Sequence, residues 1–156
     1  MSNILNNLFF KKVIILFWTV WWLLALWTDV VGGLAHLGWL HRAWAPDTNF
    51  PFLLASLGIY DISATTAGLL FVGIILWSAI CTLTFVRASL NLSKPYAIWL
   101  RYAEMAFIVS LLYWFAFFIA DQLVMKYDLE QNHMVQGGFQ LLSYLALYVL
   151  PNKTDN

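Results

Sequence analysis

Residues 64–86 read ATTAGLLFVGIILWSAICTLTFV, a stretch of 23 residues without a charged side chain, followed directly by Arg87. A helix rises about 1.5 Å per residue, so a stretch of this length crosses the roughly 30 Å hydrocarbon core of a bilayer. The segment therefore predicts a transmembrane helix and indicates an integral membrane protein.

The composition of the whole chain agrees with this class. Hydrophobic residues make up 62% of the 156 residues and charged residues only 10%, whereas a soluble domain carries about 25% charged residues. Eight Lys and Arg balance eight Asp and Glu, so no basic field exists to attract nucleic acid. We expect the lipid bilayer, and not nucleic acid, as a partner.

Three further apolar stretches, at about 13–40, 95–120 and 134–150, predict additional spans. The fold class expected is an all-α integral membrane protein, a four-helix transmembrane bundle forming one domain over residues 1–156. The first stretch is longer than a bilayer requires, and Gly32-Gly33 is its natural point for a bend. A polar stretch at 121–133 separates the last two spans.

The connection at 41–63 predicts a short interfacial helix over residues 50–57. Pro51 suits a first helical turn, Gly58 can end the helix, and the apolar side chains between them can rest at the lipid headgroups. Ser63 or Asp61 is the expected cap of the span that follows.

Basic residues predict the orientation, because short cytoplasmic loops carry an excess of Lys and Arg. With the N-terminus inside, the cytoplasmic side holds Lys11, Lys12, Arg87, Lys94, Arg101 and Lys153. Only Arg42 and Lys126 lie on the other side. This bias predicts an N-in/C-in protein, and we expect a bacterial inner (cytoplasmic) membrane.

Asp29 interrupts the first span, where an acid is costly and usually faces the interior of the bundle. Two interpretations stay open: a proton, cation or ligand site, or a hydrogen bond that holds two helices together.

In the last span, Gln136 and Gln140 belong to a stripe of polar and small residues. That stripe either lines a cavity with the Asp29 face or forms a hydrogen-bonded seam.

Near the cytoplasmic boundary, Glu104 follows Arg101 by three residues and can pair with it, and Arg87 is a second possible partner. We expect a structural ion pair, with a lipid or quinone headgroup contact as the alternative. His36 and His133 both fall toward the outer side. They can ligate a haem or a metal, or serve as ordinary polar residues.

No phosphate-binding loop, nucleophile elbow or HExxH motif is present, so the sequence supports no catalytic activity. We expect a small non-catalytic accessory or anchoring subunit of a larger membrane complex, of respiratory or electron-transfer type, with quinone, lipid or haem contacts. Its partners would be other membrane subunits or further copies of the chain. The alternatives are a small proton-linked or cation transporter or channel using Asp29, and a membrane redox protein with haem or metal at His36 and His133.

Overall fold

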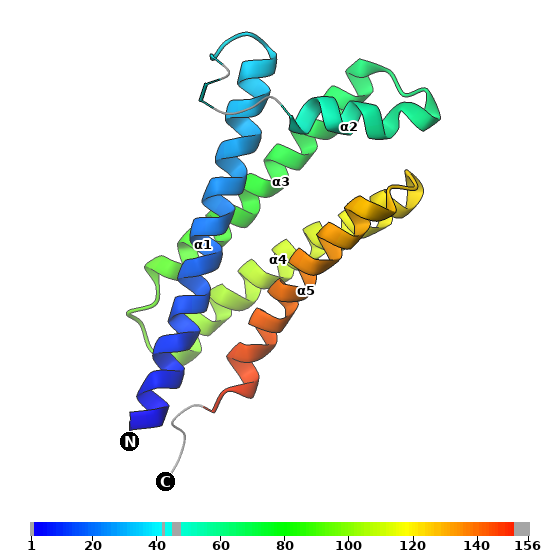
Figure 1. The fold of residues 1–156 in the computed structure, drawn as a ribbon. Helices are drawn as coiled ribbons and strands as arrows, with labels where there is room; N and C mark the ends of the chain where they lie inside the picture. Colours follow the sequence, from blue (N-terminus) through cyan, green and yellow to red (C-terminus); the bar gives the residue numbers. More distant parts are fainter. Residues whose placement is uncertain (1, 42, 45–47, 152–156) are drawn as a thin grey trace.

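The computed structural model describes residues 2–41, 43–44 and 48–151, and helices are the only regular elements in these ranges (Figure 1). In chain order they are α1 (Ser2–His36), α2 (Asn49–Leu57), the 3-10 turn η1 (Gly58–Tyr60), α3 (Ala64–Leu90), α4 (Tyr96–Leu123) and α5 (Tyr127–Val149). Three segments are long and apolar enough to cross a membrane: Asn7–His36, Ala64–Leu90 and Tyr96–Leu123. The chain is therefore an all-helical membrane protein, as its sequence predicts.

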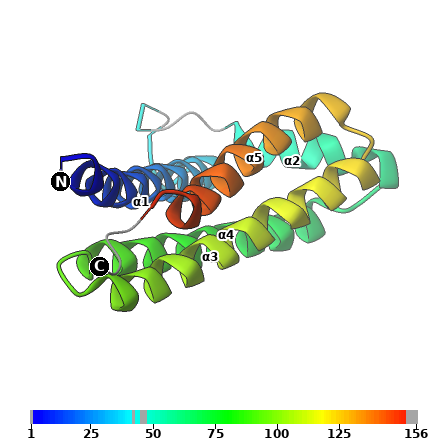
Figure 2. The same cartoon turned by 90° about the horizontal axis from the view of Figure 1, so that it is seen from below.

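The long helices pack in the order α1, α3, α4 and α5, and α2 lies against both α1 and α3. The start of α1, the end of α5 and the turn between α3 and α4 lie at one end of the molecule (Figures 1 and 2). The opposite end carries α2 and the turn between α4 and α5. We call these the terminal end and the α2 end.

The first helix runs without interruption through Gly32-Gly33 and stops only at His36. Gly38 ends it, with a φ of 76° that favours glycine. The Trp39 N–H donates to the Leu34 carbonyl at 2.9 Å, and the Gly38 N–H donates to the Ala35 carbonyl at 3.1 Å. This pair of bonds is a Schellman motif, which satisfies carbonyls left over at the helix end.

The short helix predicted over residues 50–57 is present as α2, with Pro51 in its first turn and Gly58 directly after it. The predicted cap of the following helix is also confirmed, because Ser63 Oγ accepts a hydrogen bond from the Thr66 N–H at 3.2 Å. Local sequence was sufficient in both places, since proline and serine act on the backbone of their own turn.

The last helix begins earlier than the apolar pattern indicated. The polar stretch at 121–133 is mostly helical, because α4 continues to Leu123 and α5 already begins at Tyr127. Asp128 and Glu130 lie in the first turn of α5, where negative charge favours a helix N-terminus. The low hydropathy of these residues argues against a membrane span, but it does not prevent them from forming a helix.

Aromatic side chains fill the core between the helices. The largest aromatic side chains that are fully buried are those of Trp18, Trp22, Phe85, Trp99 and Phe107. Their rings meet mostly edge to face, as where Phe85 of α3 lies 5.2 Å from Phe107 of α4.

The outer face of α3 is apolar as well. Leu76, Leu83 and Leu90 recur every seven residues along it and are 60–76% exposed. Such a stripe would be unfavourable in water, so these side chains face lipid.

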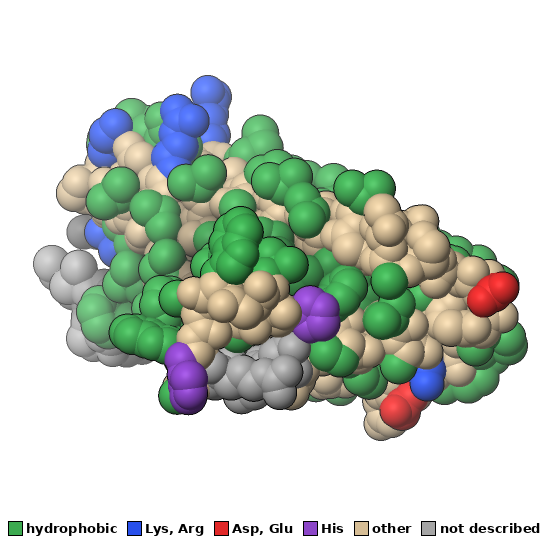
Figure 3. All heavy atoms as spheres, turned by 90° about the horizontal axis from the view of Figure 1, so that it is seen from above, with side chains coloured by type: hydrophobic (Ala, Val, Ile, Leu, Met, Phe, Trp, Pro, Cys, Tyr) green, Lys and Arg blue, Asp and Glu red, His purple; other side chains and the backbone are tan. Residues whose placement is uncertain are grey.

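Charged side chains separate along the long axis of the molecule. On the face of the molecule drawn in Figure 3, most of the visible Lys and Arg side chains lie at one end and the Asp and Glu side chains at the other. Arg87 and Lys94 flank the turn between α3 and α4, which places them at the terminal end. The middle of the face is largely apolar.

Candidate ligand-binding pocket

A pocket of about 670 Å³ lies between all five helices. Its volume is that of a typical small-molecule site, about 300–1,000 Å³. Most of its wall is apolar, with contributions from Phe52, Leu69, Leu70, Phe71, Trp77, Trp114 and Phe117. Polar side chains reach it from Asp29, Asn49, Tyr113, Asp121, His133 and Gln136. The pocket therefore combines a lipophilic interior with a few separate polar groups.

Asp29 forms the first polar group and is only 9% exposed. The Asn49 amide at the start of α2 donates to Oδ1 of Asp29 at 2.7 Å. On its other side, Ser78 of α3 lies with its hydroxyl 3.4 Å from Oδ2. Both partners are neutral, so they orient the carboxylate without balancing its charge.

Ser78 extends this group toward α4. Its hydroxyl also lies 3.4 Å from the hydroxyl of Tyr113, and its single hydrogen serves one acceptor at a time. The two oxygens are buried between α3 and α4, and Tyr113 packs against the Trp22 and Trp77 rings. A polar network thus runs from α1 through α3 to α4 beneath the pocket.

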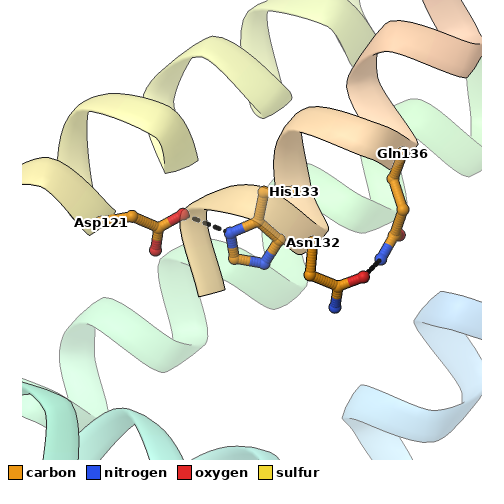
Figure 4. A network of polar contacts seen from close by, with 4 residues as sticks. All are labelled: Asp121, Asn132, His133 and Gln136. Atoms are coloured by element: carbon orange, nitrogen blue, oxygen red, sulfur yellow. Dashed lines mark hydrogen bonds and ion pairs between the residues drawn. The ribbon is translucent and has the colours of Figure 1, made fainter. Parts of the chain in front are cut away.

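Asp121 and His133 form the second polar group (Figure 4). Asp121 is 3% exposed, and its Oδ2 lies 2.5 Å from Nδ1 of His133. Phe117 and Trp114 pack against the imidazole ring. Next to this pair, Gln136 donates to Asn132 Oδ1 at 3.2 Å. The second acid of the pocket therefore has a partner that can carry positive charge.

No protein-family model matches this chain, and neither does any curated protein or solved structure. The function must therefore be argued from the pocket itself.

The two glutamines singled out from the sequence have different surroundings. Gln136 lines the pocket, whereas Gln140 is fully buried behind it and accepts a hydrogen bond from the Trp114 indole N–H at 2.6 Å. Gln140 joins α5 to α4, as in the seam interpretation, while Gln136 shares the pocket with Asp29. A cavity lined by the stripe and a hydrogen-bonded seam both stay predictions.

Three buried donors lack a partner in the part of the chain that the structure describes. They are Nε1 of Trp18, Nε1 of Trp22 and Nε2 of Gln140. Burying an unpaired donor costs about 1–3 kcal/mol, and ordered water commonly satisfies such groups. These donors lie behind the pocket wall and not in it.

Glu104 and Arg87 each contact a tyrosine. Glu104 accepts a hydrogen bond from the Tyr148 hydroxyl at 2.5 Å, which joins α4 to α5. The Arg87 guanidinium lies 4.9 Å from the centre of the Tyr102 ring. An ion pair between Glu104 and either arginine stays a prediction.

The two histidines belong to different surroundings. His36 lies at the end of α1 with its ring 4.6 Å from Phe50 of α2, and His133 is bound to Asp121. Within the described ranges, no group of three or more His, Cys, Asp or Glu side chains is placed to hold a metal. Haem or metal ligation by His36 and His133 stays a prediction.

Sequence reasoning missed Asn49 and Tyr113 as pocket residues, and it missed Ser78 as the residue that lies between Asp29 and Tyr113. Asn49 lies in the connection between two spans, and Ser78 and Tyr113 are single polar residues within apolar runs. The sequence carried one signal for Ser78 and Tyr113. A polar side chain in a span is costly in lipid, so it usually faces protein. Nothing in the sequence indicated which of them face one another.

Proposed function

We propose that this chain is a small non-catalytic subunit of a larger membrane complex that holds a lipophilic molecule in the pocket between its helices. The pocket carries this proposal, because an apolar space of about 670 Å³ with polar groups at separate points suits an amphiphile. Quinones and lipids have this chemistry, and a respiratory or electron-transfer complex is the setting in which a quinone would be held.

Nearly all of the chain lies in helices or short turns, which leaves little soluble mass for an active site of its own. The aromatic side chains of the wall offer flat surfaces for a ring system, and the leucines on α3 offer a lipid-facing surface. Other membrane subunits or a second copy of the chain would contact such outer faces.

The orientation belongs to the same proposal. Both termini are placed in the cytoplasm, α5 serves as a fourth span, and α2 lies at the outer headgroup boundary of a bacterial inner membrane. The position of Arg87 and Lys94 at the terminal end supports this arrangement, because basic residues favour the cytoplasmic side.

Purification from the native membrane in a mild detergent tests the function. Mass spectrometry would identify co-purifying subunits, solvent extraction would identify retained quinones and lipids, and an absorption spectrum of the same sample would report haem. Partners at fixed stoichiometry together with a retained amphiphile are the expected result. A protein that carries neither partner nor amphiphile would overturn the proposal.

A second candidate function is a small proton-linked or cation transporter or channel that uses Asp29. The observation that favours it is the pair of neutral partners on Asp29, which leaves its charge for a proton or a cation. The Asp29→Asn variant in a reconstituted transport assay tests it. Uptake at the wild-type rate in that variant would remove the carboxylate from the mechanism.

A further inference from the structure

The pocket is unbalanced in charge. Its described wall contains Asp29, Asp121 and His133 but neither Lys nor Arg. His133 can offset Asp121, since their side chains are hydrogen-bonded. Among the described residues, Asp29 has only Asn49 and Ser78 as hydrogen-bond partners, so the net deficit of positive charge lies at the α1 side of the pocket.

An isolated charge in a low-dielectric interior is costly unless a proton or a counterion neutralises it. The pocket offers room for a counterion that is itself large and apolar. Trp77, Tyr113, Trp114 and Phe117 line it from α3 and α4. The faces of such rings attract organic cations, with quaternary ammonium groups as the best-known case.

The hydrogen-bond donors of the wall also favour a cationic ligand. The single N–H of Trp77 already donates to the Val109 carbonyl at 3.2 Å, and that of Trp114 donates to Gln140 at 2.6 Å. The Asn49 amide is bound to Asp29. An anionic or carbonyl head group is left with the donors of Tyr113, His133 and Gln136, whereas a cationic head group finds the Asp29 carboxylate.

We propose that the molecule held in this pocket is a lipophilic organic cation of the alkylammonium type, with its charge next to Asp29 and its apolar part against the aromatic wall. This inference rests on the proposed function and specifies the ligand class within it. An amine head group is common to an aminophospholipid and to a free lipophilic amine, so the test distinguishes these two sources.

The probe is tetraphenylphosphonium, a bulky lipophilic cation, and its control is tetraphenylborate, an anion of nearly the same shape. Binding of both ions to the full chain in nanodiscs is compared with binding to empty nanodiscs. We expect saturable binding of the cation at one site and only bilayer partitioning of the anion. Specific binding of the anion, or no saturable binding of the cation, would overturn the inference.

Variants assign the site. Asp29→Asn should weaken binding of the cation about tenfold or more, as expected for the loss of one close charge partner in a partly desolvated site. Asp128 is exposed at the start of α5 and outside the pocket wall, so Asp128→Asn should bind as the wild type does. Equal binding by Asp29→Asn and the wild type would refute the inference.

Two further variants keep the test decisive if Asp29→Asn does not fold. Asp29→Glu retains the charge and should retain binding. Trp77→Leu removes an aromatic face and should weaken binding of the cation several-fold, because a ring–cation contact is lost. Wild-type affinity in a folded Trp77→Leu variant would exclude the aromatic wall as part of the site.

Native mass spectrometry separates the sources of the amine. Retention of phosphatidylethanolamine over phosphatidylglycerol in the wild type, lost in Asp29→Asn, would identify a lipid head group. Binding of the probe without lipid preference would identify a free amphiphilic amine. A chain that retains a quinone but binds no cation would refute this inference and leave the proposed function standing, whereas a chain that holds nothing would refute both.

Discussion

Asp121 of α4 and His133 of α5 lie 12 residues apart in the chain and meet at 2.5 Å across the turn that joins their helices. The carboxylate is almost fully buried, and the imidazole is held between it and the Phe117 ring. The pair therefore fixes the α2 end of the α4–α5 hairpin and one side of the pocket at the same time.

Mutation of this pair should show strong coupling. Asp121→Asn and His133→Gln should each lower the free energy of unfolding, because each leaves the remaining partner buried with a poorer hydrogen bond. The coupling energy should fall within about 0.5–3 kcal/mol, the range for residues in direct contact. Unfolding of the two single variants and the double variant in detergent micelles measures it, and additive effects would show that the contact contributes no stability.

Gly137 marks a place where α5 approaches α4 closely. A methyl group at this position would lie 2.7 Å from Cζ of Phe118 and 3.0 Å from Cβ of Trp114. Gly137→Ala should therefore destabilise the protein by about 1–3 kcal/mol, as overpacking does in other cores. The thermal midpoint in detergent should fall accordingly.

The neighbouring Gly138 provides a matched control. Nothing lies within 4 Å of a methyl group added there, so Gly138→Ala removes the same backbone freedom without a clash. We expect it to be neutral or to raise the thermal midpoint slightly, since alanine is favoured over glycine in a helix by about 1 kcal/mol. Equal losses in both variants would indicate that close packing at Gly137 is not the cause.

The hydrogen bond between Trp114 and Gln140 offers a test of the buried polar seam. Gln140→Met should destabilise the protein by at most about 1–3 kcal/mol, because the Trp114 N–H loses its acceptor in a buried position while the unpaired Nε2 of Gln140 is removed. Adding Trp114→Phe removes the stranded donor. The double variant should therefore lose less stability than the two single variants lose together. Chemical unfolding of all three variants measures these losses, and a strictly additive loss would contradict the prediction.

The proposed orientation can be tested without changing any basic residue. Ser93→Cys lies in the turn between α3 and α4, and Asp128→Cys lies at the start of α5; both positions are exposed. A membrane-impermeant maleimide added to intact cells should label the second variant and not the first. The native Cys81 is fully buried, so it should contribute little background. The opposite labelling pattern would show that the topology is the inverse of the proposed one.

Most helix starts and spans, which depend on residues close together in the chain, could be predicted from the sequence. The uncharged run at 64–86 indicated a spanning helix, and Ser63 and Pro51 indicated the starts of α3 and α2. The end of α1 was placed too late, since Gly38 and its Schellman bonds stop the helix at His36. The start of α5 was placed too late, because acidic residues lower hydropathy while favouring a helix N-terminus.

The sequence by itself determined that this chain is helical and embedded in a membrane, since an uncharged stretch of this length satisfies its own backbone only as a helix and its side chains only in lipid. It also marked Asp29 as a residue that needs a partner. Only the tertiary structure decided that Asn49 and Ser78 supply that contact, that Asp121 meets His133, and that both acids line one pocket. Helix formation depends on neighbours within a few residues, whereas the pocket depends on how separate helices pack, which hydropathy does not encode.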